Sequence, residues 1–146
     1  MDIGQLSGLE QLQFVVEGKI PPPSMGVTMG AKAVEVREGY AKFSAIASDA
    51  HLNPMGGVHG GFACTLLDSV TGCAVHSVLG PGESYGTIDL NVKMMRPVPK
   101  NTQLFAEGKV INISKSLGVS EGKLVDAEGK LYAHATCTCK IIRPAN

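Results

Sequence analysis

The sequence feature that most constrains the fold is one long, largely apolar helix that the pattern predicts after about residue 60. Prolines and glycines exclude a helix before about Val58, and Gly80-Pro81-Gly82 ends it. Between these limits, apolar residues recur every three or four positions, which is the period of an α-helix. These residues are Phe62, Ala63, Leu66, Leu67, Val70, Cys73, Ala74 and Val78. Because they cover most of the helix circumference, we expect other structure to enclose this helix.

A single carboxylate, Asp68, lies inside this helix, and burying a carboxylate is costly unless it is paired or has a task. Two interpretations remain open. Thr65 and Thr71 lie on the same face at i−3 and i+3, and either these threonines or the backbone of a partner would satisfy a structural aspartate by hydrogen bonding. Alternatively, Asp68 is a general base or a nucleophile. It lies roughly 12 Å along the axis from Gly60, so it would then act on a group held by a second subunit.

The residues before the helix offer a second site feature. Gly60 and Gly61 lie where the first-turn N–H groups have no partners in the helix, and glycine lets another group approach the backbone closely. This arrangement suits an oxyanion hole for a carbonyl oxygen, although the glycines would equally allow close packing of the helix start. Asn53 is a candidate donor to such a carbonyl or an ordinary turn residue, and His59 would position the glycine turn or act as an acid.

Composition limits the remaining possibilities. The chain has 146 residues with 13 basic and 13 acidic side chains, which argues against broad electrostatic binding of nucleic acid or an anionic membrane. No apolar run approaches the roughly 20 residues of a membrane-spanning helix, and the first residues lack the pattern of a signal peptide. We therefore expect a cytoplasmic protein. The spacing of the four cysteines favours structural thiols over a disulfide framework or a metal site.

The rest of the chain indicates an α+β domain of five to six antiparallel strands wrapped around the central helix. Residues 1–146 are expected to form this single domain, in which residues 1–23 comprise an N-terminal helix at 5–17 and a proline-rich linker. The strand at 87–95 alternates, with Ile88, Leu90 and Val92 on one face and Thr87 and Asp89 on the other. The strands are predicted at residues 33–38, 40–48, 87–95, 104–113, 118–126 and 131–142.

Two segments together resemble a known family. Residues 53–68 read NPMGGVHGGFACTLLD and residues 86–97 read GTIDLNVKMMRP. The combination of Asn, His-Gly-Gly, Asp nine residues after that His, and a Thr-x-Asp-Leu-Asn-Val strand resembles the hotdog-fold acyl-CoA thioesterases. Within these, it is similar to the phenylacetate-degradation (PaaI-type) group, which includes the thioesterase superfamily member 2 type. Asp rather than Glu at position 68 separates the chain from the hydroxybenzoyl-CoA and dihydroxynaphthoyl-CoA subgroups.

The resemblance implies hydrolysis of an acyl- or aryl-CoA thioester at the interface of a homodimer, with pairs assembling into a homotetramer. It implies that the Gly60 N–H polarises the carbonyl with Asn53 nearby, and that Asp68 of the other subunit is the base or nucleophile. Thr87 would assist the water, although the loop before it is about one residue longer than in some relatives, and His59 would hold the thioester end. Gly61, Phe62 and Leu66 would contact the substrate.

Coenzyme A also needs cations for its phosphates, for which Arg96 and Lys115 are the candidates and Arg143 a weaker one. We expect no cofactor beyond the coenzyme A of the substrate, no metal, and no nucleic-acid or membrane partner. Two alternatives to the thioesterase remain. One is a non-catalytic acyl-CoA-binding hotdog domain, and the other is a hotdog hydratase or dehydratase acting on acyl thioesters.

Overall fold

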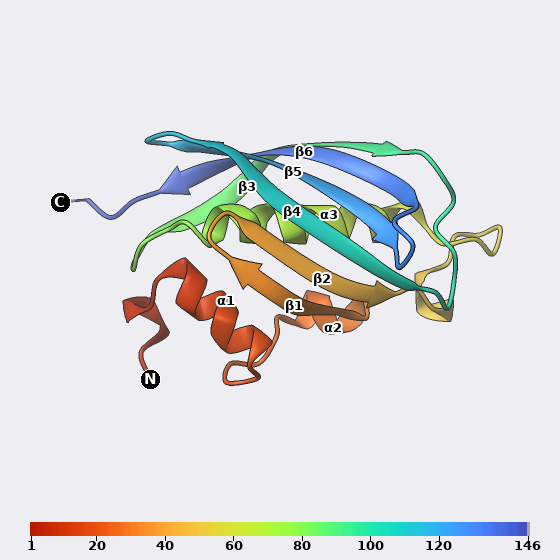
Figure 1. Ribbon diagram of the computed structural model, residues 1–146, viewed down its shortest axis with the longest axis horizontal. Helices are drawn as coiled ribbons and strands as arrows, with labels where there is room; N and C mark the ends of the chain where they lie inside the picture. Colours follow the sequence, from red (N-terminus) through yellow and green to blue (C-terminus); the bar gives the residue numbers. More distant parts are fainter. Residues whose placement is uncertain (146) are drawn as a thin grey trace.

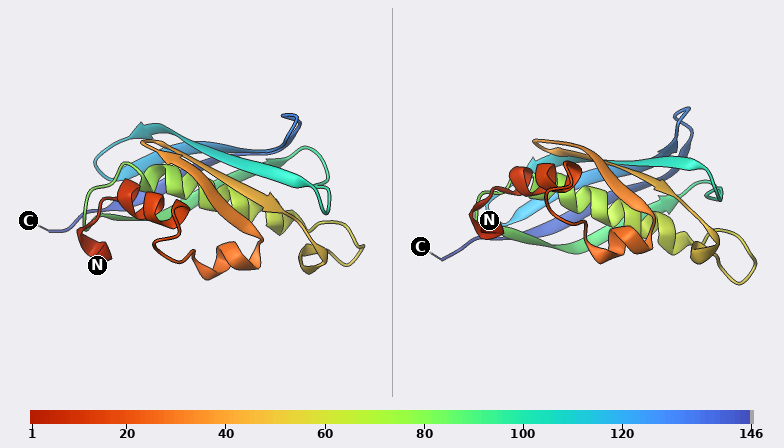
Figure 2. Two further views of the ribbon diagram at one scale, coloured as in Figure 1. Left: turned by 60° about the horizontal axis from the view of Figure 1, so that its bottom comes forward. Right: turned by 90° about the horizontal axis from the view of Figure 1, so that it is seen from below.

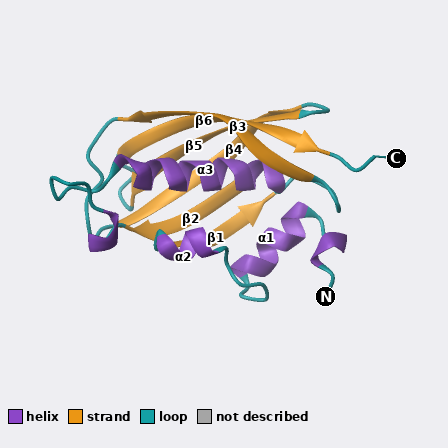
Figure 3. Ribbon diagram, turned by 180° about the vertical axis from the view of Figure 1, so that it is seen from behind, coloured by secondary structure: helices purple, strands orange, loops and turns teal. Residues whose placement is uncertain are grey.

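One curved sheet and one long helix form the body of the molecule. The computed structural model describes residues 1–145, and in it helix α3 (Gly60–His76) lies along the concave face of a six-stranded sheet (Figure 1, Figure 3). Every neighbouring pair in the order β1-β2-β4-β5-β6-β3 is antiparallel. The strands are β1 (Ala31–Arg37), β2 (Tyr40–Ile46), β3 (Ser84–Met94), β4 (Gln103–Ile113), β5 (Leu117–Asp126) and β6 (Leu131–Ile142). The predicted α+β hotdog architecture is confirmed.

The N-terminal segment covers the open side of α3 and the adjoining β1 (Figure 2). It holds a short 3₁₀ turn, η1 (Ile3–Gln5), and helices α1 (Gly8–Val16) and α2 (Ser24–Thr28). The predicted helix at 5–17 was too long, because Ser7 and Glu10 form a capping box that begins α1 at Gly8. Helix α2 was not predicted. It is one short turn with a glycine and two β-branched residues, which local preferences do not favour.

The predicted strands all exist, with shifted ends. β3 begins at Ser84 rather than at Thr87, and β1 begins two residues earlier than predicted. β2 ends at Ile46 instead of Ser48, because Ser48 caps a 3₁₀ turn, η2 (Asp49–His51). The tight turn that joins β1 to β2 has Gly39 at a φ of 75°, a conformation in which glycine has no steric penalty. The helix ends at His76, before the predicted Val78.

Two glycines allow α3 to pack directly on the sheet. Gly108 of β4 and Gly122 of β5 are paired in the ladder and lie beneath the middle of α3. A Cβ atom at Gly108 would lie 2.2 Å from the carbonyl oxygen of Val70, and one at Gly122 would lie 2.9 Å from Thr71 Cγ2. The helix backbone therefore occupies the space that a side chain would fill at Gly108, and the Thr71 side chain occupies that space at Gly122.

Polar groups buried at this contact are satisfied. The hydroxyl of Thr71 donates to the Leu67 carbonyl at 2.6 Å, and the hydroxyl of Ser120 on β5 donates to the Thr71 carbonyl at 3.1 Å. The hydrogen bond of Ser120 therefore joins α3 to β5 in addition to their packing contact. Cys137 and Cys139 of β6 are buried nearby, and all four cysteines are free thiols.

None of the helices within residues 1–145 combines the length and hydrophobicity needed to cross a membrane.

The close contact between Gly108 and α3 leads to a prediction about stability. Gly108→Ala should lower the free energy of unfolding by about 3 kcal/mol, because the new methyl group would overlap the helix backbone. Gly86→Ala is the matched control, since it also changes a strand glycine but nothing lies within 4 Å of its added Cβ. We expect the control to change stability by less than about 0.5 kcal/mol. Chemical denaturation of both variants measures the difference, and equal stabilities would contradict the close helix–sheet contact.

Candidate active site

Asp68 lies on the open side of α3 and is exposed in the single chain. The Thr87 hydroxyl, from β3, donates a hydrogen bond of 2.9 Å to Asp68 Oδ1. The expected hydrogen bonds from Thr65 and Thr71 to the Asp68 carboxylate were wrong. Those hydroxyls donate to backbone carbonyls one turn earlier, Thr65 to Gly61 and Thr71 to Leu67. The carboxylate is thus held by one strand residue and is otherwise open to a neighbouring molecule.

A β-bulge in β3 directs Thr87 towards the helix. The ladder pairs Thr87 with Cys139 and Asp89 with Thr138, so Ile88 has no partner and its side chain is 61% exposed. The predicted alternation of this strand was therefore wrong at its start. In a regular strand, Thr87 would point away from the helix with Asp89. The extra residue turns Thr87 onto the helix face, in the way that bulges beside active sites re-aim side chains.

The start of α3 leaves one backbone donor free. His59 is the N-cap, and its Nδ1 accepts a hydrogen bond of 2.8 Å from the Gly61 N–H. The Phe62 N–H donates to the His59 carbonyl at 2.9 Å. The Gly60 N–H has no acceptor among residues 1–145. It therefore carries the unpaired positive end of the helix dipole.

Beside Gly60 is a cavity of about 240 Å³, which Met94, Arg96 and Tyr132 also line. A Cβ atom at Gly60 would lie 3.0 Å from Met94 Sδ, so a side chain there would enter the cavity. Glycine at this position keeps the free N–H accessible.

The side-chain oxygen of Asn53 is hydrogen-bonded to the backbone of its own loop. Its Oδ1 accepts hydrogen bonds from the backbone N–H groups of Met55, at 3.0 Å, and of Gly57, at 3.1 Å. This arrangement is an Asx turn, so the turn interpretation of Asn53 is correct for its oxygen. The side-chain NH₂ group of Asn53 can still donate to another molecule.

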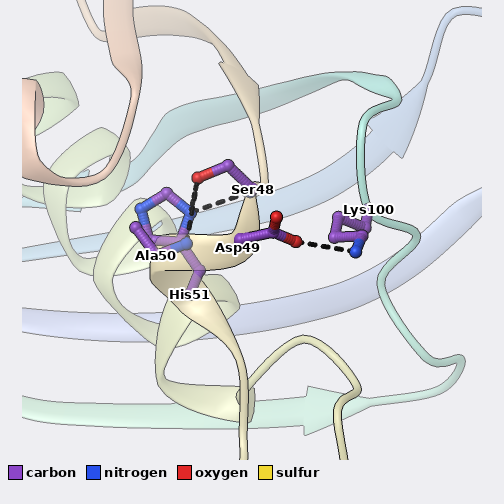
Figure 4. A network of polar contacts seen from close by, with 5 residues as sticks. All are labelled: Ser48, Asp49, Ala50, His51 and Lys100. Atoms are coloured by element: carbon purple, nitrogen blue, oxygen red, sulfur yellow. Dashed lines mark hydrogen bonds and ion pairs between the residues drawn. The ribbon is translucent and has the colours of Figure 1, made fainter.

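The loop that carries Asn53 is held in place at both ends. His51 Nδ1 accepts from the Ser48 N–H at 3.0 Å, and Asp49 pairs with Lys100 at 2.7 Å (Figure 4). The other ring nitrogen of His51 donates to the Thr28 carbonyl, and its own carbonyl accepts from the His59 N–H at 2.8 Å. These contacts give His51 a structural role in holding the loop.

Helix α3 separates the predicted contacts for coenzyme A. Arg96 lines the cavity at Gly60 and donates to the Leu131 carbonyl at 2.6 Å. Lys115 lies in the turn after β4, near the other end of the helix, where Gly118 packs on Val75. One chain does not bring these two cations together, and their role stays a prediction. Arg143 forms an ion pair with Glu83.

Two predicted substrate contacts are core residues in the single chain. Phe62 is 2% exposed and packs on the His51 ring at 5.0 Å between ring centroids, while Leu66 is 1% exposed. Leu66 nonetheless borders a second cavity, which Tyr85 and residues of the N-terminal segment also line. Sequence reasoning missed Tyr85 and Met94 as site neighbours, because their positions depend on how β3 crosses the helix.

The sequence model of the thioesterase superfamily matches residues 55–133, more than half of the chain. The chain belongs to this family. The matched stretch contains Gly60, Asp68 and Thr87 but not Asn53 or the N-terminal segment.

Solved structures and one curated sequence show the same relation. A phenylacetic acid degradation-related protein from Ralstonia eutropha is 31% identical, with a TM-score of 0.80 over 88% of this chain and 98% of that one. The PaaI protein of the Escherichia coli phenylacetic acid degradation operon is 19% identical, with a TM-score of 0.81 over 95% and 99% of the two chains, and supports the fold. The predicted resemblance to PaaI-type hotdog thioesterases is confirmed for family and fold.

Among curated sequences, a Halobacterium salinarum protein named for an esterase activity is 40% identical over 72 residues. This is 48% of the present chain and 46% of the other, so the chain spans about half the length of that relative.

Proposed function

We propose that this protein hydrolyses an acyl- or aryl-CoA thioester to a free acid and coenzyme A, in sites shared between two subunits. The observation that carries the proposal is the exposed Asp68 carboxylate, which a hydrogen bond from Thr87 orients. An oriented carboxylate on an open helix face can take a proton from water or attack a carbonyl itself. Membership of the thioesterase superfamily supplies the reaction class.

The distance between the two halves of the site supports a shared arrangement. Asp68 is eight residues from Gly60, roughly 12 Å along one helix, so both cannot act on one carbonyl within a single chain. Strand β3 is at the edge of the sheet, and Ile88 and Met94 on it are 61% and 57% exposed. An unpaired, apolar edge favours pairing with another strand. Pairing of two β3 edges in a homodimer would bring Asp68 of one subunit towards Gly60 of the other.

The proposed reaction needs only groups of the chain and water. The free N–H of Gly60 donates a hydrogen bond that stabilises the negative charge developing on the carbonyl oxygen, and the Asn53 amide donates to the same oxygen or to the water. Asp68 removes a proton as water adds to the carbonyl carbon. The C–S bond then breaks, and the coenzyme A thiolate leaves and is protonated. In the alternative order of steps, the Asp68 carboxylate attacks the carbonyl carbon, the C–S bond breaks as the coenzyme A thiolate leaves, and water then hydrolyses the resulting anhydride. Association of dimers into tetramers is part of the proposal.

The first experiment measures release of free coenzyme A from a panel of acyl- and aryl-CoAs. Asp68→Asn is nearly isosteric and should lower kcat/KM by roughly 10²-fold or more, because amide nitrogen can act neither as base nor as nucleophile. Glu38→Gln is the matched control, because Glu38 is exposed in the turn between β1 and β2, away from Asp68 and the β3 edge, and this variant should stay close to the wild type. Release that survives Asp68→Asn would remove Asp68 from the mechanism. A folded wild type that releases nothing from any substrate would favour the binding domain or the hydratase.

The Thr87 hydrogen bond gives a graded prediction. Thr87→Val keeps the shape but removes the donor to the carboxylate, and a hydrogen bond to a charged group is worth about 1.5–3 kcal/mol. We therefore expect kcat to fall by about 10- to 100-fold. Thr87→Ser keeps the hydroxyl and should retain most of the activity. If the valine and serine variants are equally active, Thr87 does not orient the base.

Mixing of subunits tests the shared site directly. Asp68→Asn and Gly60→Val should each be inactive alone, whereas their heterodimer contains one site with an intact Asp68 from one subunit and an intact Gly60 from the other. Co-expression with two different affinity tags should restore activity to the purified heterodimer, up to about half of the wild-type rate. Sites built within single chains would give no recovery, and sedimentation analysis checks that the dimer forms.

A further inference from the structure

The cavity bordered by Leu66 lies between α3 and the N-terminal segment. It has a volume of about 200 Å³ and is walled by helices α1 and α2, the first part of β1, and one face of α3. Figure 2 shows α1 and α2 lying along α3 on the side that the sheet leaves open. The apolar lining includes Leu12, Val15, Met25, Met29, Ala33 and Phe43.

The N-terminal wall is anchored at the far end of α3. The Gly8 N–H donates to the Leu79 carbonyl at 3.0 Å, and the His76 ring bonds the Gln11 side chain at 3.1 Å. A Cβ atom at Gly8 would lie 1.8 Å from the His76 carbonyl oxygen, so only glycine allows this approach. Helix α2 lies at the other end of the segment and contacts β1. The cavity is therefore covered by a segment that is anchored at the end of α3 and packs along β1.

The groups inside the cavity are neutral. Its polar lining consists of Thr65, Ser69, Cys73 and Tyr85. Burial, together with the nearby Asp68 carboxylate, raises the pKa of the Cys73 thiol to about 12. Burial raises the pKa of the Tyr85 hydroxyl as well. Both side chains therefore stay uncharged at neutral pH, and an ionised ligand would find no opposite charge there.

The cavity adjoins the Asp68 carboxylate. Thr65 and Ser69 line it, and on α3 Thr65 lies about one turn before Asp68 while Ser69 is the residue that follows it. The negative charge of Asp68 reaches both Cys73 and Tyr85, since it contributes to raising the pKa of each. If the thioester carbonyl lies at Asp68, the first few atoms of its acyl group would therefore reach the cavity.

We propose that this cavity holds the acyl group of the thioester, and that the N-terminal segment limits that group to an uncharged aryl or short alkyl chain. The inference rests on the proposed thioesterase function and adds the identity of the group that is transferred to water. Residues 1–33 then act as the wall that determines acyl specificity, and Asp68 acts on the carbonyl at the mouth of the cavity.

The volume sets the size of the acyl group. An engineered apolar cavity of about 150 Å³ takes up benzene. A cavity of about 200 Å³ therefore accommodates roughly one aromatic ring with a methylene or two, or an alkyl chain of similar bulk. A palmitoyl chain is far larger. A carboxylated acyl group such as succinyl would place its charge among neutral side chains at a high desolvation cost.

The test compares acetyl-, hexanoyl-, phenylacetyl-, palmitoyl- and succinyl-CoA as substrates. The kcat/KM of the wild type for hexanoyl- and phenylacetyl-CoA should exceed that for acetyl-, palmitoyl- and succinyl-CoA by at least about 10-fold. This ratio corresponds to about 1.4 kcal/mol of binding difference. Ala33→Leu fills the cavity from β1 and should abolish this preference while acetyl-CoA turnover remains. Val34→Leu is the matched control, because Val34 is 43% exposed and outside the lining. It should leave the substrate profile unchanged.

A second pair of variants enlarges the cavity. Met25 lines it although its side chain is 55% exposed, so Met25→Ala should open the wall at little cost in stability. We expect a shift of the optimum towards longer acyl chains, by about two to four carbons. Val27→Ala, on the same helix but outside the lining and 68% exposed, is its control and should change nothing.

The outcomes separate the two proposals. A wild type that releases coenzyme A from none of the five substrates contradicts the proposed function itself. A wild type that is active, with Ala33→Leu and Met25→Ala showing the same profile as their controls, overturns the acyl cavity and leaves the thioesterase intact. Equal or better use of palmitoyl-CoA or succinyl-CoA by the wild type also overturns it. Circular dichroism confirms that each variant is folded.

Discussion

The close approach of α3 to the sheet is the interaction on which the rest of the structure depends. Gly108 lets the helix backbone lie directly on β4, and the paired Gly122 on β5 leaves room for the Thr71 side chain. One side of α3 therefore packs on the sheet, and the opposite side faces the N-terminal segment and solvent. A larger residue at either glycine would lift the helix and separate Asp68 from Thr87, because these two residues belong to different layers.

Much of the fold followed from residue order, since the helical period after residue 60 and the six strand patterns are local signals. The main errors were also local. The residues of helix α2 do not have a high helix propensity. The bulge at Ile88 could not be found from the alternation of apolar and polar residues along β3. Asp68 was recognised as a residue that needed an explanation, but its hydrogen bond to Thr87 depends on the ladder register between β3 and β6, which spans about 50 residues of sequence.

The candidate site shows the same division. His59, Gly60 and Asn53 lie within one loop, and their spacing was sufficient to predict a turn that presents a free N–H at a helix start. The shape of the cavity beside Leu66 could not be predicted, because it combines the N-terminal helices with β1, β2 and α3. The sequence alone also could not show that Arg96 and Lys115 lie near opposite ends of the helix.

The roof of the cavity lies outside the stretch that the thioesterase superfamily shares, since residues 1–33 precede the matched residues 55–133. If the cavity holds the acyl group, part of the substrate choice is encoded outside the stretch that carries the reacting groups. Exchange or drift of the N-terminal segment could then give a related enzyme a new substrate without disturbing the residues that perform the reaction. Such a modular arrangement offers a simple route by which one catalytic scaffold supplies many pathways with enzymes.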